Sequence, residues 1–240
     1  MLNNVLKLFV ADVKRLAKYN ILQISFGLAI LYGAIIYFTS AQEAELLVTL
    51  LVFVDATMMS IIMLGASLFY EKQEGSLKSV LVTPVKLVEI IISKVMSAVI
   101  LSFITAIVLS LVGVLVHGAN INIPLLLLYA TLGASTHITI GLVLVIISKD
   151  FNTLLVNYML FVIVFTLPAI FYATGVIPAS WQWFIYISPS YVTQMLINTS
   201  IGIMPSTIMH IGGIAYLVAL TVITYKTFVV KKFKEYVIRG

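Results

Sequence analysis

Three polar side chains able to exchange protons or bind a polar ligand stand inside strongly apolar stretches: Asp55, His137 and Asn157. A carboxylate placed in a membrane-spanning helix costs about 2.5–3.5 kcal/mol, so Asp55 needs a partner. Two roles for Asp55 stay open: a substrate or ion contact, or a protonated carboxyl that hydrogen-bonds hydroxyls such as that of Thr57. His137 and Asn157 fit interhelical hydrogen bonds better than a substrate pathway, which is their alternative role.

Ser135 and His210 have the side chains of a serine hydrolase, and their segments look like those of rhomboid-type intramembrane proteases. A catalytic pair requires hydrogen-bond reach between the two side chains. Ser135 lies well inside its apolar stretch, whereas His210 lies near the end of another, so their depths disagree. Small residues such as Gly133 and Ala134 also serve close helix packing, and the protease is the least favoured reading.

The elements that hold these residues are apolar throughout. The chain has 240 residues, of which 62% are hydrophobic and 10% charged, and its mean hydropathy is +1.15. Soluble domains carry roughly 25% charged residues, so this composition excludes a soluble globular domain. The absence of cysteine from the sequence excludes a disulfide-stapled module, a cysteine nucleophile and a thiolate metal site.

Six charge-poor runs predict six membrane-spanning helices, because a bilayer core about 30 Å thick requires roughly 20 apolar residues per helix. The runs cover Asn20–Ser40, Leu46–Phe69, Val95–Val116, Leu125–Ser148, Thr153–Tyr172 and Thr207–Phe228. An even number of spans places both termini on the same side of the membrane.

The distribution of positive charge indicates which side of the membrane this is. All fourteen Lys and Arg residues fall in the N-terminal arm, the second and fourth connections and the C-terminal tail. The opposite connections carry Glu43 and Glu45, with His117 and His210 nearby. By the positive-inside rule we expect a multi-pass cell-membrane protein with both termini in the cytoplasm.

Residues 1–19 predict an amphipathic helix at the membrane surface. Apolar residues recur at three- and four-residue steps, as at Leu2, Val5, Leu6, Phe9, Val13 and Leu16. Basic side chains occupy most of the other positions, which suits contact with anionic lipid headgroups. A docking surface for a cytoplasmic subunit is the alternative.

Residues 70–94 form the most charged connection. Leu77, Val80 and Leu81 share one face of a short predicted helix, which Gly75 precedes and Pro84 ends. Such a helix, held between two spans, is suited to insertion into a groove of a soluble partner.

Residues 173–204 contain no Lys or Arg but several Pro, Trp and Tyr residues. Those we single out are Pro178, Trp181, Trp183, Pro189 and Tyr191. Prolines prevent one continuous helix, and Trp and Tyr favour the headgroup level, so we expect a re-entrant helical hairpin dipping into the outer leaflet.

These last two segments resemble the permease subunits of ABC-2 type ABC transporters. The first contains Glu74-Gly75-Ser76-Leu77, Leu81-Val82-Thr83-Pro84, Glu89 and Lys94. The second contains Pro178, Trp181-Gln182-Trp183-Phe184 and Ser188-Pro189-Ser190-Tyr191. With six spans, the resemblance covers essentially the whole chain, as one transmembrane domain over residues 1–240.

The resemblance implies a homodimer or heterodimer of such subunits, bound to cytoplasmic ABC ATPases and exporting a substrate, which we expect to be lipophilic or amphipathic. The residues implied to couple to the ATPase are Glu71, Glu74, Gly75, Leu77, Lys78, Leu81 and Pro84. The chain has no Gly-x-x-x-x-Gly-Lys-Ser/Thr loop. We therefore expect a non-enzymatic subunit that holds no metal or cofactor of its own, while ATP and Mg²⁺ bind to the partner. We also expect the subunit to contact membrane lipid and to have no nucleic acid partner.

An ion-coupled secondary transporter is the main alternative, because Asp55 and His137 could relay protons. This class predicts inverted repeats with Gly- or Pro-broken spans in both halves of the chain. The sequence offers one Pro-interrupted region, around residues 168–189, and no convincing repeat.

Overall fold

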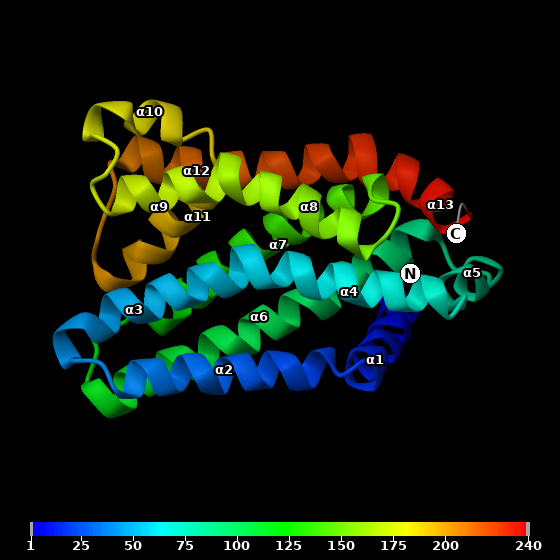
Figure 1. Ribbon diagram of the computed structural model, residues 1–240, viewed down its shortest axis with the longest axis horizontal. Helices are drawn as coiled ribbons and strands as arrows, with labels where there is room; N and C mark the ends of the chain where they lie inside the picture. The colour runs from blue at the N-terminus through cyan, green and yellow to red at the C-terminus, as the bar shows by residue number, and fades with distance from the viewer. Residues whose placement is uncertain (1, 239–240) are drawn as a thin grey trace.

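The computed structural model describes residues 2–238 and is all-α over that range, with no strand. Residue 1 and residues 239–240 of the predicted domain lie outside the described part. The helices form one elongated bundle (Figure 1). Helices α1 (Leu2–Lys18), α5 (Ser76–Leu81) and α13 (Val230–Ile238) lie at one end, together with both ends of the chain. We call this the basic end, because the described Lys and Arg residues lie on these helices and the adjoining ends of their neighbours.

Five helical stretches among residues 2–238 are long and apolar enough to cross a membrane. They are Ala41–Gln73, Leu87–His117, Ile123–Ile147, Phe151–Ala173 and Thr207–Ile238. The first joins α3 (Ala41–Val54) to α4 (Ser60–Gln73), and the next two are α6 and α7. The fourth joins α8 (Phe151–Phe161) to α9 (Leu167–Ala173), and the last joins α12 (Thr207–Thr224) to α13. Helices α1 and α2 (Ile21–Tyr37) pass the same test only as a pair, bent by 72°. The prediction of an all-α membrane protein is confirmed, with α2 as the sixth span if the bent pair counts as one.

The bend between α1 and α2 is made at Asn20, whose backbone is left-handed at φ 59°. Residues 2–18 are helical, as predicted, and the buried face of α1 carries Val5, Asp12 and Leu16. The turn sets α1 across the end of the bundle, while α2 runs along it (Figure 1).

Three of the long helices contain one π-helical turn each. These turns are η1 (Asp55–Met59), η2 (Val162–Thr166) and η5 (Tyr225–Val229). The second lies just before Pro168, which has no N–H to donate to the carbonyl four residues earlier. The π turn therefore absorbs the interruption without ending the span.

The predicted hairpin is present at the opposite end of the bundle as α10 (Gln182–Ile185) and α11 (Pro189–Asn198). Trp181 and Trp183 are 54% and 74% exposed, whereas Pro189 and Tyr191 are buried. Helix α11 is buried along nearly its whole length against α3, α7 and α12.

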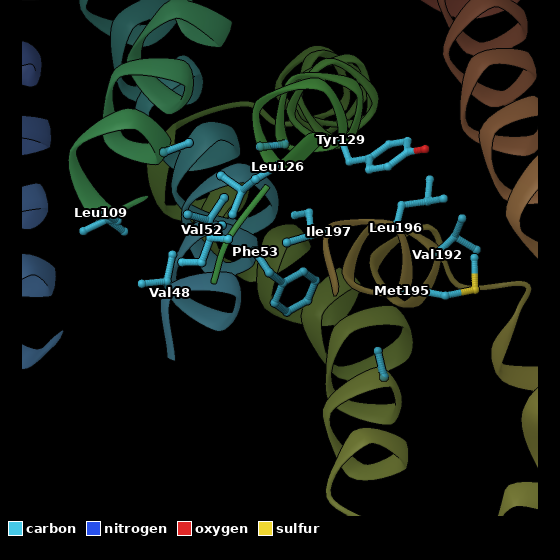
Figure 2. Packing of buried hydrophobic residues seen from close by; sticks show 14 of the residues in the cluster. Val48, Val52, Phe53, Leu109, Leu126, Tyr129, Val192, Met195, Leu196 and Ile197 are labelled. Carbon is cyan, nitrogen blue, oxygen red and sulfur yellow. The ribbon is translucent and has the colours of Figure 1, made fainter. Parts of the chain in front are cut away.

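The largest apolar cluster surrounds α11 and is shown in Figure 2. Phe53 of α3, Leu109 of α6, Leu126 of α7 and Leu196 of α11 are all fully buried in it. A Cβ added at Gly133 of α7 would overlap the Thr193 side chain of α11. The close approach of these two helices therefore requires glycine at position 133.

Candidate functional site

The connection between the second and third spans folds as predicted into a short helix, α5. Gly75 precedes α5 with a left-handed backbone, φ 71°, which glycine adopts without steric cost. The helix ends at Leu81, before Pro84. The chain thus leaves α4 (Ser60–Gln73), makes one and a half turns outside the bundle and enters α6.

The apolar stripe of α5 faces the chain itself. Leu77 is 3% exposed and packs in a cluster with Leu68 of α4, Ile90 of α6 and Val237 of α13. Val80 and Leu81 are half-buried against the same cluster. The Leu77 side chain thus completes the internal core of this chain, and insertion of the stripe into a partner stays a prediction.

The outward face of α5 and the turn after it carry the accessible side chains. Val82 is 87% exposed, and Lys78, Ser79, Thr83 and Pro84 are exposed beside it. We call these five residues the coupling face. The coupling face thus presents one apolar side chain among mainly polar ones at the tip of the bundle.

Glu71, predicted to meet a partner, is instead fully buried behind α5. Lys94 Nζ donates to Glu71 Oε2 at 2.6 Å and to Asp12 Oδ1 at 2.5 Å. Arg15 Nη1 lies 3.0 Å from Asp12 Oδ1 and 3.6 Å from Glu71 Oε2. We call Asp12, Arg15, Glu71 and Lys94 the ion cluster. Its two acids and two bases balance in formal charge, which is what allows such groups to be buried.

Two serines complete the ion cluster. The Ser67 hydroxyl donates to Glu71 Oε1 at 3.1 Å, and the Ser93 hydroxyl donates to Asp12 Oδ2. The cluster therefore ties α1, α4 and α6 together directly behind the coupling face. No such cluster was predicted, although Asp12 stands at the same helical spacing as Val5 and Leu16 and so lies on the apolar face of α1.

A more exposed contact joins α1 to the start of the connection. Lys18 Nζ lies 2.8 Å from Glu74 Oε1, and the Tyr19 hydroxyl donates to Glu74 Oε2 at 2.7 Å. These two hydrogen bonds hold the pKa of Glu74 below its ordinary value of 4.5. We call this contact the Glu74 tether.

Asp55 is buried, 7% exposed, on the π turn η1. It lies against the hydroxyls of Ser102 and Thr105 on α6. Thr57, the partner suggested from sequence, donates its hydroxyl hydrogen to the Phe53 carbonyl at 2.7 Å. Asp55 thus has two hydroxyl-bearing neighbours on α6, and no ion pair to it is present among residues 2–238.

His137 and Asn157 have partners of their own. His137 is fully buried, with Nδ1 2.8 Å from the Gly133 carbonyl and Nε2 3.2 Å from the Ser190 hydroxyl of α11. Asn157 donates to the Ser148 hydroxyl at 2.9 Å. The interhelical role fits both residues, and within the described chain no hydrogen bond joins either of them to Asp55.

The structure does not bring Ser135 and His210 together as a catalytic pair. The Ser135 hydroxyl donates to the Thr131 carbonyl at 2.7 Å within its own helix. His210 Nε2 lies 2.6 Å from the Tyr129 hydroxyl. Both side chains are thus engaged in contacts that hold helices rather than in activating a nucleophile.

Comparison with known proteins bears on the whole arrangement. The family model described as ABC-2 type transporter matches residues 6–201, a range that includes α5, the ion cluster and the α10–α11 hairpin. None of the curated proteins compared matches the chain.

Proposed function

Because the chain belongs to the ABC-2 type transporter family, we propose that it is the membrane-spanning subunit of an ATP-driven exporter for a lipophilic or amphipathic substrate. The family match establishes a multi-pass permease subunit of an ABC transporter, which confirms the resemblance seen in the sequence. The proposal adds export, the substrate class, a dimer of permease subunits, and a cytoplasmic ABC ATPase that holds ATP and Mg²⁺. It also places both termini, and therefore the basic end, in the cytoplasm.

The observation that carries the proposal is the coupling face at the basic end. A partner that pushes on Val82 or Lys78 pushes on a helix whose Leu77 is packed into the bundle. The buried contact of Glu71 with Lys94 joins the two spans on either side of α5. Displacement of α5 would therefore move α4 and α6 together. In this way a conformational change in a partner protein can be passed on to the membrane-spanning helices of this chain.

A cleft in the opposite half of the bundle supports the substrate class. It has a volume of about 560 Å³ and lies between α3, α9 (Leu167–Ala173) and α11. Its walls are mostly apolar, and the polar side chains in them include those of Gln182, Tyr191, Gln194 and Asn198. Apolar walls with a few polar groups favour a ligand that has both an apolar body and a polar part.

The test is Val82→Asp in a complex of this subunit with its ATPase, reconstituted in proteoliposomes. We expect substrate-stimulated ATPase activity to fall about tenfold or more, because the substitution places a charge in an apolar contact. The fold should be unaffected, since Val82 is 87% exposed. Val176→Asp, at an exposed position of the opposite end, is the matched control.

Substrate-stimulated ATPase activity at the wild-type level in the Val82→Asp complex would contradict the proposed role of the coupling face. Transport driven by a proton gradient in the absence of any ATPase would contradict the proposal as a whole. That second result would instead favour the secondary transporter, with Asp55 as its carboxylate.

A further inference from the structure

A second site lies at the basic end, away from the coupling face. It is a pocket of about 620 Å³ between the ends of α4 and α7 and the last turns of the α12 to α13 helix. We call it the basic pocket. Its lining residues are Lys72, Ile146, Ile147, Ser148, Lys149, Phe228, Lys232, Glu235 and Tyr236.

Three lysines from three different elements converge on the basic pocket. Lys72 comes from the end of α4, Lys149 from the turn between α7 and α8, and Lys232 from α13. The one carboxylate among the lining residues, that of Glu235, lies 3.3 Å from Lys232 Nζ. Three lysines and one glutamate leave the pocket with a formal charge of +2.

Asp150 follows Lys149 in the chain and does not line the pocket. It accepts from the Thr153 backbone N–H at 2.7 Å, caps the first turn of α8 and offsets part of the charge of Lys149. Lys72 Nζ lies 4.6 Å from the centre of the Tyr236 ring, a contact that orients the ammonium group without neutralising it. The pocket therefore offers an anion several positive charges at once.

The other wall of the basic pocket is apolar and continues onto a membrane-facing surface. Ile147 is 53% exposed, and Phe228 is half-buried beside it. The α12 to α13 span is the least covered by the rest of the chain: 11% of its apolar window is buried, against 33% or more for the other four. The pocket thus lies where a lipid-facing surface meets a rim of lysines.

We propose that the basic pocket binds the phosphate headgroup of an anionic phospholipid, with an acyl chain lying along Ile147 and Phe228. A phosphate accepts charge-assisted hydrogen bonds from ammonium groups, and pockets of this kind between spans suit such headgroups. A free phosphate would gain only the lysine contacts, whereas a lipid gains the apolar wall as well. The assignment to the cytoplasmic leaflet rests on the orientation proposed above; the binding itself does not.

The experiment compares lipid retention by purified variants, using native mass spectrometry in a neutral detergent. The test variant is Lys72→Gln, Lys149→Gln and Lys232→Gln combined. The control, Lys226→Gln, Lys231→Gln and Lys234→Gln, removes the same charge from exposed lysines at the same end of the bundle, outside both the pocket and the N-terminal helix. A third variant with arginine at the three pocket positions keeps the charge and guards against a loss caused by misfolding.

The probes are phosphatidylglycerol, phosphatidylcholine and inorganic phosphate. We expect wild-type protein, the control and the arginine variant to retain phosphatidylglycerol in preference to phosphatidylcholine. For the glutamine pocket variant we expect affinity to fall on the order of a hundredfold, since each surface lysine strengthens such binding about fivefold. Phosphatidylglycerol should also raise the thermal midpoint of wild-type protein but not of this variant.

Three results would overturn the proposal. One is an equal loss of lipid from the pocket variant and the control, which would indicate general surface charge. Another is inorganic phosphate binding as tightly as the lipid, which would indicate a free-anion site. The third is unchanged lipid binding with loss of the co-purified ATPase, which would make the pocket a protein-docking surface. Because the assay needs neither ATP nor transport, its outcome is independent of the proposed function.

Discussion

Lys94 is the side chain on which the ion cluster depends. Its ammonium group stands between two buried carboxylates, those of Asp12 and Glu71, and is itself 3% exposed. Removal of one partner from a buried ion pair costs more than the pair contributes, because the remaining charges are left without compensation. The cluster is thus a buried structural element that joins α1, α4 and α6.

We expect Lys94→Met to lower the free energy of unfolding by about 3–5 kcal/mol, measured by denaturant unfolding in detergent. Lys94→Met combined with Glu71→Gln should recover part of this loss, since one of the stranded charges is removed as well. Equal stability of Lys94→Met and wild-type protein would contradict the account of the cluster.

At the residue scale, the polar residues inside apolar stretches could be identified from the sequence, whereas the side chains that they contact could not. The spacing of Val5, Asp12 and Leu16 contained the information that an acid lies on a buried face. For Glu71 the resemblance implied a role in coupling, and its position along the helix gives no sign that it faces Lys94. That the neighbours of Asp55 are Ser102 and Thr105 depends on how α6 packs against η1, which local sequence does not determine.

At the scale of elements, α1 is held to the rest of the basic end partly by the Glu74 tether. The pKa of Glu74 is lowered in the folded protein, so the tether stabilises the fold above the ordinary carboxyl pKa of 4.5. That stabilisation is lost as the pH falls through the lower folded-state value. We expect amide exchange near Lys18 and Tyr19 to be constant from neutral pH to about 5 after correction for intrinsic rates, and to rise in more acid solution.

Glu74→Gln is the control for this prediction. The variant has no titrating carboxyl at the tether, so its corrected exchange near Tyr19 should be raised already at neutral pH and vary less in the acid range. The same acid-induced rise in Glu74→Gln as in wild-type protein would assign the effect to another group.

The contact of α7 with α11 gives a second prediction at this scale. Gly133→Ala should lower the free energy of unfolding by about 1–3 kcal/mol, because the added methyl overlaps Thr193. Gly27→Ala, at a helical glycine with open space around it, should cause no loss. Tolerance of both substitutions alike would mean that α7 and α11 do not approach as described.

The elements themselves were largely predictable. Apolar runs of sufficient length located the spans, and Gly75 and Pro84 located the ends of α5, because backbone conformation at such residues is restricted locally. The π turns could not be predicted, since α and π turns have the same hydropathy. Nor could the direction of the α5 stripe, because Leu77, Val80 and Leu81 suit a partner's groove and the chain's own core equally well.

At the scale of the whole molecule, the basic side chains of the described residues gather at one end of the bundle and the exposed tryptophans lie at the other. The ion cluster, the coupling face and the basic pocket all lie at the basic end, whereas the hairpin with exposed Trp181 and Trp183 lies at the other (Figure 1). This separation fits a molecule held at a fixed depth and orientation in a membrane, with one end for a partner in water.

The most direct test of the central claim is labelling of a single cysteine at Val82 with a membrane-impermeant maleimide. The sequence has no cysteine, so Val82→Cys and the control Gln42→Cys, beside Glu43 in the opposite connection, each report one exposed position. In intact cells we predict labelling of Cys at 42 alone. After permeabilisation Cys at 82 should react, and a co-expressed ABC ATPase should protect it. Labelling of position 82 from outside intact cells, or equal labelling with and without the ATPase, would contradict the account.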